Sequence, residues 1–156
     1  MMLTWFECKV RYEKTLENGM NKKVTEPYLV DALSFTEAEA RIIEEVSPYI
    51  SGEFTIADIK RANYTELFFC EEDSADRWFK CKLTFISLDE KSGAEKKTSS
   101  NVLVQAADLR DAVKKLDEGM KGSMMDYVIS SMAETAIMDV FPFSADPDVK
   151  PEFPQA

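Results

Sequence analysis

Histidine is absent from the 156 residues of this chain. Its absence removes the commonest general base, a common metal ligand, and every Ser-His or Cys-His nucleophile arrangement. The chain also lacks a Walker loop, a G-x-S-x-G elbow and a G-x-G-x-x-G loop. Gly119 and Gly122 follow a predicted helix, where glycine is the expected stop signal. We therefore predict no catalytic residue and no cofactor.

Cysteine is scarce, and its spacing is not that of a metal site. Cys8, Cys70 and Cys81 are odd in number and contain no C-x-x-C pair. This argues against both a disulfide framework and a structural zinc, and it predicts a reduced, cytoplasmic setting. The acidic run 71–76 matches no calcium-binding loop, so we interpret it as a solvated linker and predict no metal site.

Long apolar runs are also missing. No stretch approaches the roughly 20 apolar residues of a membrane span, and charged residues interrupt the N-terminus before a secretory signal could form. We expect no membrane partner. The formal net charge of −10 disfavours nucleic acid over most of the surface and favours a protein partner.

What the chain does contain is an internal repeat. The stretch TWFECKV, which begins at Thr4, returns as RWFKCKL, which begins at Arg77. An offset of 73 pairs the Trp, Phe, Cys and Lys residues of the two copies, and an offset of 74 pairs the following segments. The period suits a half-domain and is too long for a solenoid.

Each copy predicts the same elements. Alternation from Trp5 to Lys14 and from Trp78 to Ile86 is typical of half-buried strands. Asn18-Gly19 and Ser92-Gly93 predict hairpin turns into second strands. A capping box at Ser34 then starts one helix, and a similar acidic cap at Asp108 starts the other.

The last element of each copy is ambiguous. Residues 125–136 fit a helical period, whereas the matching residues 54–68 are rich in β-branched and aromatic side chains. Because both copies should share one structure, we predict a long strand with a bulge near Ala57-Asp58 and near Ser130-Ser131.

The predicted fold class is α+β. We expect a first β-β-α-β repeat over 1–70, the acidic linker over 71–76, a second repeat over 77–142 and a Pro-rich extended tail over 143–156. The repeats should form one globular domain about a pseudo-two-fold axis, with mainly antiparallel sheet and two helices on one side. The pattern leaves open whether there is one sheet or two.

The segments TWFECKVRYEKT, EPYLVDALSFTEAEARIIEE, DIKRANYTELF, RWFKCKL and ETAIMDVFPF resemble an uncharacterised domain-of-unknown-function family of anaerobic gut bacteria and their phages. The resemblance extends to about Phe143 and includes both copies of the repeat. It implies a bacterial or phage cytoplasmic protein, and it implies no activity, cofactor or catalytic residue.

The candidate binding residues lie on the outer strand face and near the hairpin turns. Trp5 and Trp78 alternate out of phase with the core aromatics, so they are predicted to share a face with lysines. An exposed tryptophan could stack on a ring or anchor a protein, but a duplicated sheet often buries both faces. The full set of candidates is Trp5, Lys9, Trp78, Lys82, Lys22, Lys23, Lys96 and Lys97.

These patterns support three hypotheses. The preferred one is a non-enzymatic protein-interaction module with an unidentified protein partner, in which homo-oligomers are also possible. The second is a nucleic-acid or nucleotide binder that uses the tryptophans and lysine pairs. The third, an enzyme with Asp, Tyr or Lys in a pocket between the repeats, has no supporting constellation.

Overall fold

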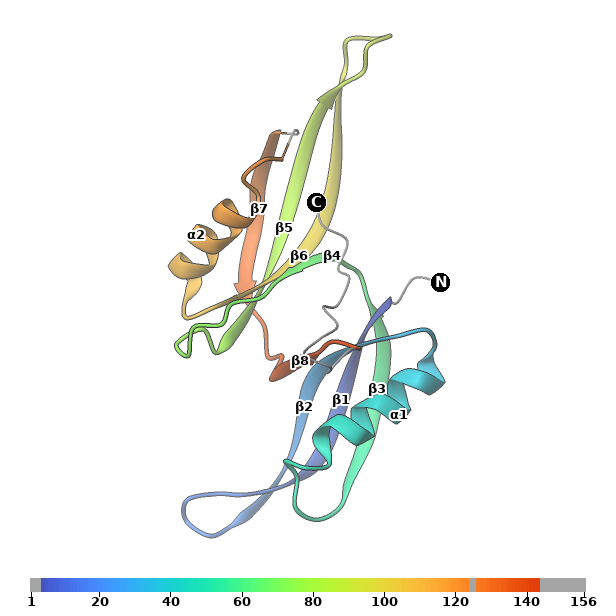
Figure 1. Ribbon diagram of the computed structural model, residues 1–156, viewed down its shortest axis with the longest axis vertical. Coiled ribbons are helices and arrows are strands. Elements are labelled where there is room, and N and C mark those ends of the chain that lie inside the picture. Colours follow the sequence, from blue (N-terminus) through green and yellow to red (C-terminus); the bar gives the residue numbers. More distant parts are fainter. Residues whose placement is uncertain (1–3, 124–125, 144–156) are drawn as a thin grey trace. The chain divides into compact units, whose positions relative to one another are not determined.

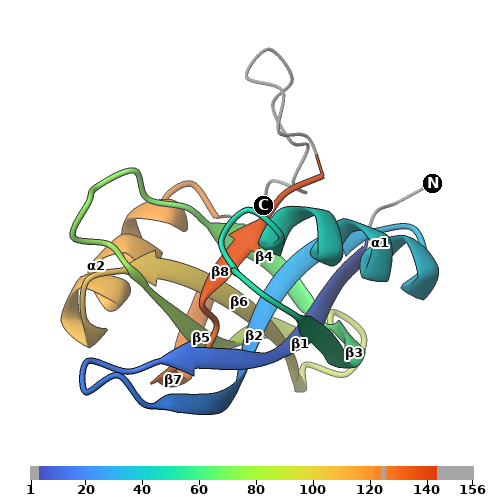
Figure 2. The ribbon, with the colours of Figure 1, turned by 90° about the horizontal axis from the view of Figure 1, so that it is seen from below.

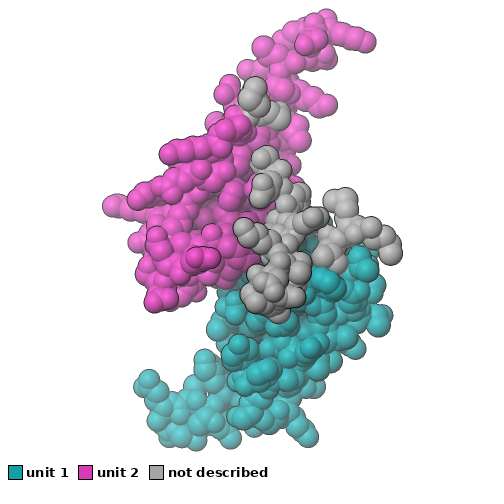
Figure 3. Space-filling view, in the orientation of Figure 1, with its two compact units in different colours: residues 1–63, 136–151 teal, residues 64–135, 152–156 magenta. Residues whose placement is uncertain are grey.

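The computed structural model describes residues 4–123 and 126–143. They form two four-stranded sheets, each with one helix, which divide the chain into two compact units (Figure 1, Figure 3). Of the described residues, 4–63 and 136–143 belong to unit 1, and 64–123 and 126–135 belong to unit 2. The predicted α+β class, with two similar strand-rich halves, is confirmed.

Unit 1 begins with a long antiparallel hairpin. Strand β1 (Thr4–Thr15) pairs with β2 (Asn21–Ala32) along its whole length, and Gly19 occupies the turn with a φ of 82°. Helix α1 (Phe35–Val46) follows, capped where the Ser34 side chain accepts a hydrogen bond from the Glu37 amide. Strand β3 (Phe54–Ala62) then returns antiparallel to β1. The strand order is β3-β1-β2-β8.

Unit 2 repeats this plan. Strands β5 (Arg77–Leu88) and β6 (Glu95–Ala106) form the hairpin, and helix α2 (Leu109–Gly119) begins after its N-cap Asp108. Strand β7 (Asp126–Glu134) is antiparallel to β5. The strand order is β4-β6-β5-β7. Residues 126–134, where the helical period competed with strand, are therefore strand.

Both predicted bulges are present. The β1–β3 register skips Ala57, and the β5–β7 register skips Ser130. Each bulge adds one residue to the edge strand and keeps the apolar residues on both sides of it facing the helix. This explains why the sequence of β7 mimics a helical period: the bulge interrupts the simple alternation.

The prediction of one uninterrupted third strand was wrong. The strand breaks at Asn63, and β4 (Tyr64–Phe68) pairs in parallel with β6 of the second repeat. Reciprocally, β8 (Asp139–Phe141) pairs in parallel with β2 of the first repeat. Each repeat therefore supplies the last edge strand of the other repeat's sheet. Periodicity could not reveal this exchange because it identifies a strand without its pairing partner.

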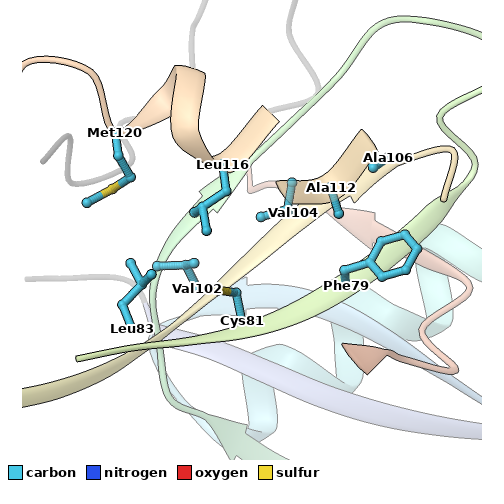
Figure 4. Packing of buried hydrophobic residues seen from close by; sticks show 9 residues of the cluster. All are labelled: Phe79, Cys81, Leu83, Val102, Val104, Ala106, Ala112, Leu116 and Met120. Atoms are coloured by element: carbon cyan, nitrogen blue, oxygen red, sulfur yellow. The ribbon is translucent and has the colours of Figure 1, made fainter. Parts of the chain in front are cut away.

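Each helix covers one face of its own sheet (Figure 1, Figure 2). In unit 1 the core between helix and sheet includes Phe6, Cys8, Val10, Val30, Ala38, Ile42 and Val46. In unit 2 it contains Phe79, Cys81, Leu83, Val102, Val104, Ala106, Ala112, Leu116 and Met120 (Figure 4). Among them, the residues of β1, β5 and the two helices are those that strand alternation and helical spacing predict to face inward.

Part of the predicted acidic linker is packed against unit 2. Ala75 is buried, and the Glu72 carboxylate contacts Lys115. The predicted tail, 143–156, lies outside the described residues except for Phe143.

Candidate functional site

The two tryptophans are buried. Trp5 is 7% exposed and Trp78 is 3% exposed, although both point to the sheet face opposite the helix. The Trp78 ring meets the Phe69 ring edge-on, with centroids 5.5 Å apart. Neither indole is therefore presented to solvent for stacking on a ligand, and the sheet face is covered around both tryptophans.

The candidate lysines occupy positions of different exposure. Lys9 is half-buried, whereas Lys82, Lys22, Lys23, Lys96 and Lys97 are exposed. The latter four lie on the outer parts of the two hairpins, in different units. Because neighbouring residues of a strand point to opposite faces, the two lysines of each pair do not form one cationic patch.

A buried ion pair in unit 1 holds the chain after β8. Arg41 of α1 contacts the Asp31 carboxylate at 2.9 Å, and it donates to the Pro142 carbonyl at 2.9 Å. Its guanidinium also lies 5.4 Å from the centre of the Phe143 ring. We call Asp31 and Arg41 the unit 1 latch.

The Asp31 side chain is only 6% exposed. Burial raises the pKa of its carboxyl, and this effect outweighs the opposing influence of Arg41. The carboxylate also accepts a hydrogen bond from the Phe143 amide. A charge this deeply buried needs its partners, since an uncompensated buried charge is costly.

A neutral acceptor performs the same task in unit 2. Gln105 and Lys115 occupy the positions that the repeat pairs with Asp31 and Arg41, and we call them the unit 2 latch. The Gln105 side chain accepts from the Cys70 amide at 2.9 Å, directly after β4. Lys115 lies 3.3 Å from Glu72 and 2.8 Å from Asp111, whose contact raises the pKa of the lysine.

Sequence reasoning missed both latches. The repeat alignment contained the signal, since an offset of 74 pairs Arg41 with Lys115 and Asp31 with Gln105. The change from Asp31 to Gln105 hid the equivalence. Asp31, Arg41 and Gln105 bind the chain's own backbone, and Lys115 contacts carboxylates of the same unit, so we assign all four a structural role.

The cysteine thiols of the two cores are inert. Cys8 and Cys81 are fully buried, and all three cysteines are free. Burial raises the pKa of Cys8 to about 12 and the pKa of Cys81 to about 11. A thiol with such a pKa is almost wholly protonated at neutral pH and is a poor nucleophile or metal ligand.

Two classes of site can be checked directly in the described ranges. Residues 4–123 and 126–143 contain no group of three or more Cys, Asp or Glu side chains arranged to hold a metal ion. Over the same residues, neither helix has the length and apolarity needed to cross a membrane.

The edge strands differ in a way that bears on binding. Strands β3 and β7 hold equivalent positions at one edge of each sheet, and in the described part of the chain neither has a strand on its outer side. Strand β3 carries Asp58, Lys60 and Arg61. Strand β7 is uncharged from Tyr127 to Ala133.

Side chains on β7 are available on the face away from α2. Val128 is 49% exposed, and Ser131 and Ala133 are also exposed. On the other face, Tyr127, Ile129 and Met132 pack against the unit 2 core. We call the outer backbone edge of Asp126–Glu134 the β7 edge. The core face of β7 packs against the unit 2 core. Among the described residues, no strand pairs with the outer backbone groups of β7.

The geometry thus defines an α+β protein of two similar strand-rich halves, with one charged and one uncharged sheet edge. Residues 4–143 match the family model described as Domain of unknown function (DUF4494), and the chain belongs to that family. No curated protein matches the chain, and no solved structure matches it.

Proposed function

We propose that this chain is a non-enzymatic protein-interaction module that receives an extended strand of a partner protein at the β7 edge. The observation that carries the proposal is the seven-residue uncharged stretch Tyr127–Ala133 on an edge strand. Backbone N–H and C=O groups along such an edge can extend the sheet by one strand, a common mode of peptide recognition.

The contrast with β3 strengthens the proposal. Proteins commonly protect exposed sheet edges with charged side chains, prolines or bulges, because an open edge promotes aggregation. Strand β3 follows this practice, with three charged residues among its last five. Strand β7 has a bulge but no charge between its two ends, so its edge is the less protected of the two.

The pairing of β7 with β5 shows which backbone groups of β7 point away from β5. The Thr135 amide donates to the Trp78 carbonyl at 2.8 Å, opposite the end of β7. In an antiparallel pair the inward and outward groups alternate, so Met132 directs its amide away from β5. A partner strand would accept a hydrogen bond from this amide.

A charge on the β7 edge tests the proposal. Val128→Lys adds a solvent-facing lysine to β7, and Thr55→Lys adds one to the already charged β3 as a matched control. Partners captured from native lysate by the wild-type protein, with nuclease present, should be lost with Val128→Lys and kept with Thr55→Lys. The purified partner should then slow amide exchange at Met132.

Other results would redirect the assignment. Capture that is unaffected by Val128→Lys would contradict the β7 edge. Capture that disappears with nuclease would favour nucleic acid, despite the net charge of −10.

We also propose that the protein works in the reduced cytoplasm of anaerobic gut bacteria or their phages. The residue resemblance supports this origin, and three free cysteines, two of them fully buried, suit a reducing compartment. Disulfide mapping of the protein isolated from its source under acid quench should find all three thiols reduced. A native disulfide would contradict this setting.

A further inference from the structure

Acidic side chains flank the uncharged centre of the β7 edge. Asp126 and Glu134 are the first and last residues of β7, and both are exposed. Asp117 of α2 accepts a hydrogen bond from the Tyr127 hydroxyl at 3.0 Å, which brings a third carboxylate to the end that begins with Asp126. Glu134 lies 3.2 Å from Arg77.

This charge pattern disfavours a second copy of the chain as occupant. An isologous antiparallel pairing of two β7 strands centred on Ser130 would place Asp126 of each copy opposite Glu134 of the other. Like charges directly opposite each other destabilise a strand pair, and here this would happen at both ends. A shifted register would relieve the repulsion only by shortening the paired segment.

We infer that the β7 edge selects a partner strand with basic residues at both ends and an uncharged, β-branched or hydroxyl-bearing centre. The inference rests on the proposed function, since it names the chemistry of the strand that this edge receives. Cross-strand pairs of opposite charge stabilise a sheet, so a lysine or arginine at each end of the partner would face a carboxylate. An uncharged centre would match Tyr127–Ala133.

Two synthetic peptides test the selection. One has the sequence Lys-Thr-Val-Thr-Val-Thr-Val-Thr-Lys with blocked termini, and the other has Glu at both ends. In NMR titrations at low salt, the Lys-flanked peptide should shift the amides of β7 and bind about five-fold more tightly than the Glu-flanked peptide, as expected for two exposed ion pairs. The preference should shrink at high salt.

Two variants of the protein distinguish the effect of the flanking charge from the effect of strand pairing at the β7 edge. Asp126→Lys should reduce or reverse the preference, and Val128→Lys should abolish binding of both peptides while the folded spectrum of unit 2 is kept. Equal binding of both peptides at β7 would overturn the charge selection and leave the proposed function standing. No shift of β7 amides with either peptide would overturn both.

The oligomeric state, measured by sedimentation, provides a third test of the inference. If the wild-type protein sediments as a dimer and Val128→Lys as a monomer, the edge is occupied by a second copy and the inference is wrong. We expect both proteins to sediment as monomers.

Discussion

Unit 1 and unit 2 fasten their exchanged strands with different chemistry. Strand β8 has three residues and is secured by a buried Asp31–Arg41 pair. Strand β4 has five residues and is followed by the chain that Gln105 binds, and the carboxylate partners of Lys115 are more exposed than Asp31. A shorter strand forms fewer ladder hydrogen bonds, so more of its attachment depends on side chains. Backbone pairing therefore contributes more to the attachment of β4, and side-chain contacts contribute more to the attachment of β8.

The equivalent edge strands β3 and β7 also differ between the two units. The unit 1 edge is charged and protected, and the unit 2 edge is uncharged and flanked by acids. Because the surrounding fold is the same, the fold itself does not require this difference. Each unit therefore serves as an internal control for the other.

The largest expected effect comes from removing Arg41. Arg41→Ala leaves the Asp31 carboxylate buried without its cation and should lower the free energy of unfolding by about 3 kcal/mol. Lys115→Ala should cost about 1 kcal/mol or less, since Glu72 and Asp111 can be solvated. Urea unfolding of both variants measures the difference.

A double variant checks the reason for this difference. Asp31→Leu combined with Arg41→Met removes both charges and should recover much of the lost stability. Equal losses for Arg41→Ala and Lys115→Ala would show that the two latches contribute equally to stability, contrary to their different burial.

Gly119→Ala should have an intermediate effect that is specific to unit 2. Alanine normally favours a helix over glycine by about 1 kcal/mol. Here a Cβ at position 119 would lie 2.6 Å from Cε1 of Phe68 on β4, so the substitution should instead destabilise by about 1–2 kcal/mol. Thermal unfolding gives the sign.

The repeat offers a control for this substitution as well. The matching residue of unit 1 is Glu45, and Glu45→Ala should not produce a clash. Stabilisation by Gly119→Ala would mean that the Phe68 ring moves aside freely, and the close packing of α2 on β4 would lose its importance.

The smallest effects should appear in alkaline solution. Burial raises the pKa of Cys81 to about 11 and the pKa of Cys8 to about 12, above the value of about 8.5 for a free thiol. Stability from these thiols is therefore complete below about pH 8.5 and is lost as pH rises through the folded pKa values. Iodoacetamide should label Cys81 before Cys8 as pH is raised from 9 to 11.

The labelling order also compares the two cores. Mass spectrometry of the folded protein would identify the labelled thiol at each pH. Labelling of Cys8 before Cys81, or rapid labelling of both at pH 8, would contradict the stronger burial effect at Cys8.

Much of the fold could be predicted because local patterns repeat. The duplicated WF-x-CK segments, the two hairpin turns and the capped helices are all local, and agreement between copies resolved the ambiguous β7 in favour of strand. The strand exchange could not be predicted in this way. It depends on which distant edge receives β4 and β8, and neither strand carries that information in its own spacing.

The site was less predictable than the fold. Alternation placed Trp5 and Trp78 on the correct face but could not show that this face is covered. The lysine pairs are exposed, yet strand geometry separates the members of each pair. The β7 edge emerged only when the strand order showed which uncharged strand ends a sheet.

Strand binding at the β7 edge can be measured by amide hydrogen exchange along β7 and β3, with and without the Lys-flanked peptide. Bound peptide should slow exchange at the outward Met132 amide and leave exchange at the amides of β3 unchanged. Protection confined to β3, or no added protection at Met132 under saturating peptide, would contradict the assignment of the β7 edge as the binding surface.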